Sequence, residues 1–214
     1  GNETARTINN GVDTTKGAMV WVKNRDNASF PPYLYDTERG TNKQLRSSSD
    51  AAQTSGTNTL TAYNNNGISL GTDTMINRNG DSHVAWSFRK APGFFDVVKY
   101  TGSNTEQNIA HNLGCVPGCI IVKRIDQGSG YDWAVLHRGF NEENPGTHVA
   151  WLNLSNAAGA NSNYWDNTAP TSTHFCAKAG YAQVNQAGGE YIAYLFAGGE
   201  STAATARSVS FDGS

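Results

Sequence analysis

The feature that most constrains the fold is an internal repeat, because a repeated sequence unit must return as a repeated structural unit. The run Met-Val-Trp-Val-Lys at 19–23 has a counterpart in Cys-Ile-Ile-Val-Lys at 119–123. Further on, Val-Ala-Trp-Ser-Phe at 84–88 is answered by Ile-Ala-Tyr-Leu-Phe at 192–196. Between these runs, Asn77 and Gly80 match Asn185 and Gly188 in the same order. We therefore predict that 17–91 and 118–197 superpose as two copies of one unit.

Within each copy the residue pattern is that of strands. Val84, Trp86 and Phe88 alternate with polar residues, which places three large apolar side chains on one face of a strand. We expect that face to be core, so that Trp86→Ala would cost on the order of 3 to 5 kcal/mol. No window shows sustained helical spacing. The expected fold class is all-β: an internally duplicated, antiparallel β-sandwich with about five strands per repeat.

The repeat also suggests how the chain is divided. The expected parts are a first β repeat at 1–91 that starts inside its unit, an inter-repeat segment with the first strand of the second unit at 92–117, a second repeat at 118–199, and a linker or the start of a further domain at 200–214. The pattern leaves open whether the halves share one fused core or fold as tandem domains.

Charge and hydropathy exclude two classes of partner. The formal net charge is -2, and no run of Lys or Arg supplies a local basic patch, so nucleic acid is not an expected partner. No stretch of 18 apolar residues occurs, and the first 20 residues lack the pattern of a signal peptide. Membrane insertion is therefore not expected.

Three patterns have the residue types of catalytic or metal sites, and none has the required context. Gly67 to Gly71 reads Gly-x-Ser-x-Gly, but no helix follows Ser69 as a nucleophile elbow requires. His111, Cys115 and Cys119, with Cys176 or His174, have zinc-ligand chemistry, but Gly114, Pro117 and Gly118 forbid the helix that would gather them. The carboxylates Asp26, Asp36, Glu38, Asp126 and Asp132 show no spacing that selects an acid and base pair. We predict no catalytic residue, no metal ligand and no cofactor.

Aromatic residues beside polar groups give the candidate binding site. Tyr131 and Trp133 flank Asp132, and Tyr164 and Trp165 precede Asp166, in segments that read as loops. Exposed rings with neighbouring polar groups are suited to bind sugars, since a ring covers an apolar sugar face and the polar groups take hydroxyls. The alternative is that each ring is a core anchor at a strand end. Tyr131, Trp133, Tyr164 and Trp165 are the predicted ligand-binding residues.

Several longer segments resemble a known family. Gly-Ala-Met-Val-Trp-Val-Lys-Asn-Arg-Asp at 17–26, Gly-Ile-Ser-Leu-Gly-Thr-Asp at 67–73 and Val-Ala-Trp-Ser-Phe-Arg-Lys-Ala at 84–91 resemble a domain of unknown function that recurs in structural proteins of marine tailed phages. The segments at 96–102 and 109–114 look like the linker between its repeats. The ending Phe-Asp-Gly-Ser at 211–214 is similar to the opening of a laminin-G-like or concanavalin-like segment.

The resemblance implies a virion protein, assembled in the host cytoplasm and located in a tail or fibre. The implied function is non-catalytic assembly and host-surface recognition, and the implied partners are further copies of the chain, other virion proteins and a host-surface glycan. Because tail fibres are commonly trimers, a homotrimer is the expected oligomer. The alternatives are a secreted carbohydrate-binding or polysaccharide-degrading domain, and a capsid decoration protein.

Overall fold

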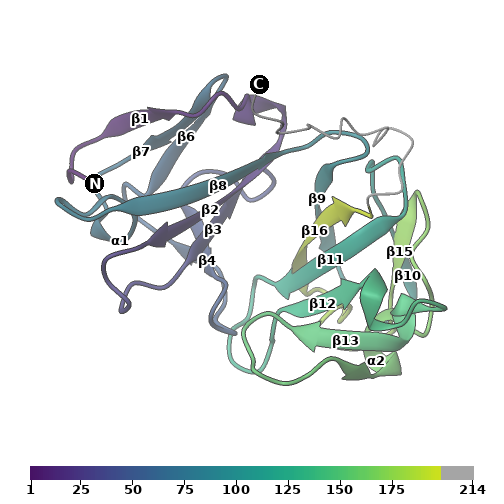
Figure 1. The fold of residues 1–214 in the computed structure, drawn as a ribbon. Helices are drawn as coiled ribbons and strands as arrows, with labels where there is room; N and C mark the ends of the chain where they lie inside the picture. Colours follow the sequence, from purple (N-terminus) through teal and green to yellow (C-terminus); the bar gives the residue numbers. More distant parts are fainter. Residues whose placement is uncertain (199–214) are drawn as a thin grey trace, which may run out of the picture.

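The structure is a computed structural model that describes residues 1–198, and these are almost entirely short strands and turns (Figure 1). The strands of the first half are β1 (Arg6–Asn9), β2 (Ala18–Asn24), β3 (Tyr33–Asp36), β4 (Lys43–Arg46), β5 (Thr54–Ser55), β6 (Leu60–Asn64), β7 (Gly67–Leu70) and β8 (His83–Arg89). Those of the second half are β9 (Phe95–Thr101), β10 (Gln107–Ala110), β11 (Pro117–Arg124), β12 (Ala134–His137), β13 (His148–Trp151), β14 (Gly159–Ala160), β15 (His174–Ala177) and β16 (Glu190–Ala197).

The helices are single turns: η1 (Thr14–Lys16), α1 (Thr74–Asn77), η2 (Arg138–Phe140), η3 (Pro145–Thr147) and α2 (Ser162–Trp165). The mostly β fold with antiparallel sheets is confirmed. The expected number of strands per half was too low, because several strands have only two to four residues, which is too short for an alternating pattern to show. The segment at 211–214, predicted to open a further domain, lies outside the described residues.

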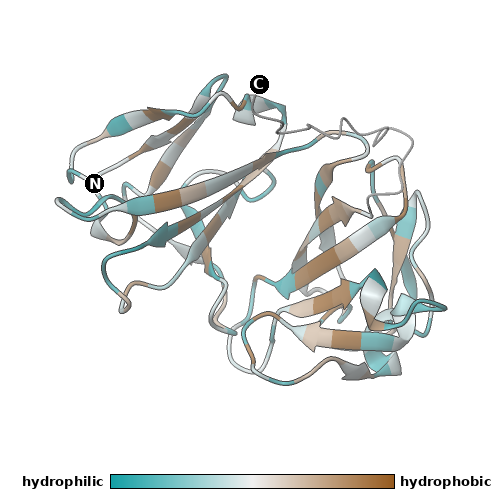
Figure 2. Cartoon of the chain, in the orientation of Figure 1, coloured by the Kyte–Doolittle hydropathy of each residue, from teal (hydrophilic) through white to brown (hydrophobic). Residues whose placement is uncertain are grey.

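Each half has a larger and a smaller sheet. The strand orders are β5-β4-β3-β2-β8 and β1-β7-β6 in the first half, and β14-β13-β12-β11-β16-β9 and β10-β15 in the second. Hydrophobic residues lie along these strands and hydrophilic ones gather in the turns (Figure 2). The larger sheets differ at one edge, since β16 lies between β11 and β9, whereas β8 has only β2 beside it in the described chain.

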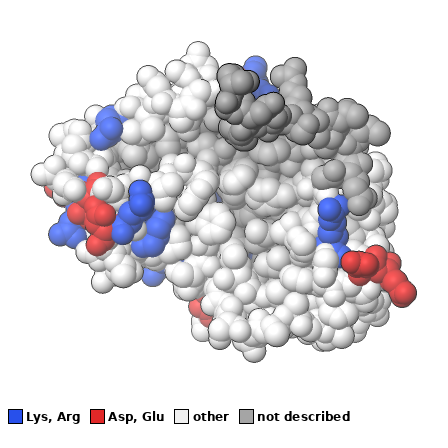
Figure 3. Space-filling model, in the orientation of Figure 1, with Lys and Arg blue, Asp and Glu red and all other residues white. Residues whose placement is uncertain are grey.

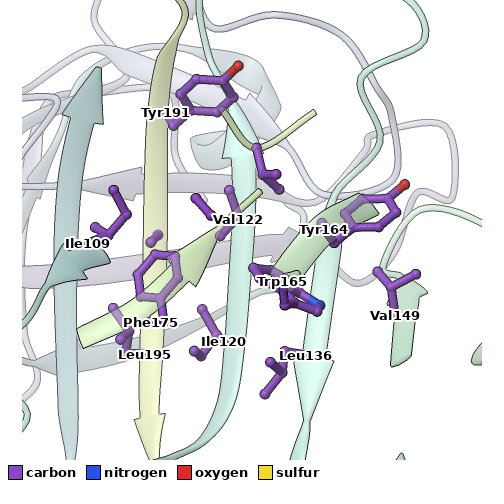
Figure 4. Close-up of a cluster of buried hydrophobic side chains, with 14 of the residues drawn as sticks. Ile109, Ile120, Val122, Leu136, Val149, Tyr164, Trp165, Phe175, Tyr191 and Leu195 are labelled. Atoms are coloured by element: carbon purple, nitrogen blue, oxygen red, sulfur yellow. The ribbon is translucent and has the colours of Figure 1, made fainter. Parts of the chain in front are cut away.

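Inside each half a hydrophobic core lies between the two sheets. The first core is formed by Val20, Val22, Tyr33, Tyr35, Leu60, Ile68, Leu70 and Ile76. The second core is larger and includes residues of β10, β11, β12, β13, β15, β16 and α2, among them those labelled in Figure 4. Alternation along β2 and β11, for example, sends Val20 and Val22, and Ile120 and Val122, into the core of their own half.

The remaining faces of the two larger sheets meet each other. Here a third cluster, the junction core, is formed by Met19, Leu34, Leu45, Phe95, Val97, Ile125, Trp133, Ile192 and Tyr194. The first three come from the first half and the others from the second. The halves therefore share buried apolar surface. The strand β16 is covered on both faces, since Ala193 and Leu195 lie in the second core and Ile192 and Tyr194 in the junction core.

A buried ion pair lies beside the junction core. The Nε of Arg39 donates to Asp36 Oδ2 at 2.5 Å, and the hydroxyl of Tyr194 donates to the same oxygen at 2.7 Å. Burial is the largest single influence on the pKa of Arg39 and lowers it. The charge of Asp36, its hydrogen bond and the nearby tyrosines together outweigh burial, so the pKa of Arg39 is raised. Because Tyr194 belongs to the second half, this network ties the halves together.

The prediction for Trp86 is wrong. Its side chain is 48% exposed, and β8 contains no buried residue. The matched residue Tyr194 is fully buried. The two residues hold the same register position, since Trp86 is paired with Trp21 and Tyr194 with Ile121. Their exposure differs because β8 is an edge strand and β16 is an inner one, so Trp86→Ala would open no cavity.

Two buried asparagines, one in each half, make the same hydrogen bonds. Asn77 Nδ2 donates to the carbonyls of Thr4 and Gly71, and its Oδ1 accepts from the backbone of Asn2. Asn185 Nδ2 donates to the carbonyls of Thr105 and Ala177, and its Oδ1 accepts from the backbone of Ser103. Each asparagine thus fastens the segment that leads into β1 or β10.

Candidate functional site

Three of the four predicted binding residues are buried. Trp133 and Trp165 have no exposed surface, and Tyr164 is 1% exposed. Tyr164 and Trp165 lie in the second core, near Leu136 and Val149 (Figure 4). The expectation that these rings are exposed platforms is wrong, and the alternative of core anchors describes them.

Trp133 has a role that its sequence context did not indicate. Its ring packs in the junction core, parallel to that of Tyr194, and its Nε1 donates to the carbonyls of Arg46 and Ser49 in the first half. The two acceptors lie more than 80 positions away. The sequence around Trp133 shows only that the residue follows an aspartate. It gives no sign that the indole Nε1 donates to backbone in the first half.

Tyr131 is the only one of the four with appreciable exposed surface. It is half-buried, and the guanidinium of Arg124 lies 4.6 Å from its ring centroid. Arg124 in turn donates to Asp126 at 2.9 Å. A cation stacked on one face leaves less ring surface for a sugar. A ligand-binding role for the four residues stays a prediction, and it has lost the exposure on which it was based.

The exposed aromatic side chains lie elsewhere, on β8 and its neighbours. We call Trp21, Trp86, Phe88 and Phe94 the aromatic strip. The ring centroids of Trp21 and Trp86 are 6.1 Å apart, and those of Phe88 and Phe94 are 6.3 Å apart. Trp86 and Phe94 are 48% and 51% exposed, while the other two are half-buried.

Strand pairing explains how the strip forms. Trp21 on β2 lies directly opposite Trp86, and Met19 lies opposite Phe88, so these side chains share one face of the sheet. Phe88 continues into the junction core through Phe95 and Phe196, at 5.8 and 5.3 Å between centroids. The strip is therefore the exposed margin of the junction core along an open sheet edge. The alternation of 84–88 predicted its face correctly but not its exposure.

The surface around the strip carries little charge. Figure 3 shows that most of this face is neither acidic nor basic, and that its charged side chains occur largely in small groups of mixed sign. An uncharged aromatic surface is suited to contact another protein surface.

The second half also contains a cavity of about 620 Å³. It is lined by Cys115, Val116, Pro117, Arg138, Gly139, Glu142, Pro145, Ala169, Pro170 and Gly198. Its size is that of a small-molecule site. Arg138 and Glu142 supply one charge of each sign, and the remaining lining is mainly apolar.

The candidate zinc residues are not brought together. Both ring nitrogens of His111 bond to backbone, with Thr171 O and Leu113 N, at 3.3 Å each. Cys119 lies on β11 and Cys176 on β15, in different sheets. Residues 1–198 contain no group of three or more His, Cys, Asp or Glu side chains that could hold a metal ion.

Burial makes two of the three free cysteines poor nucleophiles. It raises the pKa of Cys119 and of Cys176 to about 11. About one thiol in a thousand is then ionised at pH 8. We expect an aromatic disulfide reagent at pH 8 to modify Cys119 and Cys176 at least ~10 times more slowly in the native chain than in urea, as followed by peptide mass mapping. Equal rates in both states would show that these thiols are not buried.

The other catalytic candidates are all held by neighbouring groups. Ser69 lies inside β7, where its Oγ accepts from Asn64 Nδ2 at 2.9 Å. The carboxylates of Asp26, Asp36, Glu38, Asp126 and Asp132 bond to Ser82, Arg39, Lys90, Arg124 and Asn153, respectively. Ser69 is thus a strand residue. The expectation that no helix follows it was wrong in one respect, since the single helical turn α1 begins at Thr74.

These features define a mostly β module with two halves joined by a shared core and an aromatic strip along an open sheet edge. The chain belongs to the family described as a domain of unknown function (DUF7483), whose model matches residues 1–206. No curated protein and no solved structure shows a significant match. Among the described residues, no helix is both long and apolar enough to cross a membrane. The predicted resemblance is confirmed as far as a domain of unknown function.

Proposed function

We propose that the chain is a non-catalytic structural module of a tailed-phage virion, located in a tail or fibre, and that the aromatic strip is its assembly contact. The resemblance to phage structural proteins supports the virion context. The strip supports the assembly role, and it is the observation on which that role rests. A homotrimer and a host-surface glycan as ligand stay predictions.

The strip has the chemistry of a protein contact. Aromatic side chains are enriched in the centres of interfaces, and tryptophan is over-represented among the few residues whose truncation costs about 2 kcal/mol or more of binding energy. Trp86 and Phe94 leave about half of their surface in water. Burying that apolar surface would contribute roughly 25 cal/mol per Å². A neighbouring part of the particle that covers the strip would therefore gain binding free energy from this buried surface.

We further propose that the two halves are copies of one unit. The strand order of the larger sheets supports this equivalence. It is β5-β4-β3-β2-β8 in the first half and β14-β13-β12-β11-β16 in the second, where β9 follows β16. The matching hydrogen bonds of Asn77 and Asn185 support the same equivalence. Such a module would be rigid, because each half covers a face of the other.

A pair of exposed apolar residues allows a matched test. We expect Trp86→Lys to lower incorporation of the chain into purified particles by about tenfold or more, which corresponds to about 1.4 kcal/mol of contact energy. Leu154→Lys is the control, because Leu154 is 43% exposed and lies outside the strip. The melting temperatures of both variants should equal that of the parent. Normal incorporation of Trp86→Lys would refute the strip as an assembly contact.

A further inference from the structure

The two halves differ at one edge of their larger sheets, next to the aromatic strip. In the second half, β9 pairs with the outer edge of β16, with Val97 opposite Tyr194 and Phe95 opposite Phe196. Both Val97 and Phe95 belong to the junction core. With this strand in place, five consecutive residues of β16 are buried, from Tyr191 to Leu195.

In the first half, the edge of β8 that corresponds to this one has no neighbouring strand in the described chain. The residues of β8 are all exposed or half-buried, and Ala85 and Trp86 are both exposed. An open edge presents unpaired backbone N–H and C=O groups to which another strand can bond. Here it also presents a tryptophan.

The hydrogen bonds of Gly1 at the edge of β8 match those of Gly102 at the edge of β16. In the second half, the backbone N of Gly102, directly after β9, donates to the carbonyl of Gly189 at 2.9 Å. In the first half, the nitrogen of Gly1 donates to the carbonyl of Asp81 at 2.5 Å. Gly1 therefore stands at the edge of β8 where Gly102 stands at the edge of β16.

A second pair of bonds repeats this correspondence. Gly188 donates to the carbonyl of Gly102 at 3.1 Å, and Gly80 donates to the carbonyl of Gly1 at 3.3 Å. Gly80 and Gly188 both have positive φ, +81° and +73°, a conformation that favours glycine. The turn before β8 and the turn before β16 thus hold the incoming chain in the same way.

We propose that the open edge of β8 is an acceptor for one extended strand, which occupies relative to Gly1 the place that β9 occupies relative to Gly102. This inference rests on the assembly role and the repeat equivalence proposed above, and it names the partner of the strip. The strand runs antiparallel to β8 and carries the apolar alternation of β9. Val97 lies five positions before Gly102, and Trp86 lies five positions after Asp81. The residue five positions before Gly1 therefore lies opposite Trp86 and covers it.

The sequence of β9 serves as the probe. A fusion places the sequence of residues 94–101 directly before Gly1. Its control carries proline at the position of Val98, because the N–H of Val97 bonds to Asp96 Oδ1 and the ladder donor at this point of the strand is that of Val98. We expect the fused strand to slow hydrogen exchange of the β8 amides by about tenfold or more. It should also shield Trp86 from acrylamide quenching, and the proline control should behave as the parent chain. Equal exchange in the fusion, the control and the parent would refute the proposal.

Crosslinking tests the register. In the fusion, a cysteine at the position of Val97 should form a disulfide with Trp86→Cys, because directly opposed residues have the required Cα separation. It should not form one with Ser87→Cys, whose side chain points to the other face. A disulfide with Ser87→Cys, or a fusion that fails to fold, would contradict the proposed strand. These measurements use the isolated chain, so their failure would leave the result of the incorporation test standing.

Discussion

Trp133→Ala is expected to lower the free energy of unfolding by about 3 to 5 kcal/mol, whereas Trp86→Ala changes it by less than about 1 kcal/mol. Trp133 is fully buried in the junction core, and its removal leaves a cavity as well as two carbonyls, of Arg46 and Ser49, that lose their donor. Trp86 is 48% exposed at a sheet edge. Urea unfolding followed by circular dichroism measures both values.

A third variant separates the contribution of the packed Trp133 ring to stability from that of its Nε1 hydrogen bonds. Trp133→Phe keeps most of the ring volume and removes the Nε1 donor, so we expect a smaller loss of about 1 to 3 kcal/mol. If Trp133→Ala were no more destabilising than Trp86→Ala, the halves would not share the junction core described above. A role of Trp133 as an exposed sugar platform would then regain its basis.

Asp36→Asn is expected to destabilise the chain by about 3 to 5 kcal/mol, because it leaves the buried charge of Arg39 without its counter-charge. Asp36 and Arg39 are 0% and 9% exposed, and the amide that replaces the carboxylate cannot accept as strongly from Arg39 and Tyr194. Glu38→Gln is the matched control on the same segment. Its ion pair with Lys90 is partly exposed, so its loss should cost less than about 1 kcal/mol.

The double variant Asp36→Asn with Arg39→Met tests whether the unpaired charge of Arg39 causes the loss of stability in Asp36→Asn. Removing both charges should restore a large part of the stability lost in Asp36→Asn, because no unpaired buried charge remains. Thermal unfolding at constant pH gives the comparison. A double variant that is as unstable as the sum of its single variants would show that the two side chains act independently.

The alternating patterns made many strands of the fold predictable, whereas the site depends on pairing between strands far apart in the sequence. The structure places Trp86 opposite Trp21 and Tyr194 opposite Ile121. Burial of the two residues differs because β9 covers only one of them. That difference arises between strands, so no alternation pattern within β8 could reveal it.

Contacts with residues far away in the sequence also explain why three of the four predicted binding residues are buried. Trp133, Tyr164 and Trp165 stand beside aspartates, which suggested exposed loops. In the structure, the indole of Trp133 reaches the carbonyls of Arg46 and Ser49, and the indole of Trp165 bonds to the carbonyl of His148 at 3.1 Å. A polar neighbour in sequence does not expose a ring when distant backbone supplies a partner for its donor.

If the chain is a virion protein, it must be a built-in part of the particle. Quantitative mass spectrometry of purified particles, with a labelled standard for the chain and for the major capsid protein, measures this. We expect a fixed number of copies per particle that stays constant between preparations and through repeated gradient purification. A chain that is absent from purified particles and recovered instead as free protein in the culture medium would not be a virion protein.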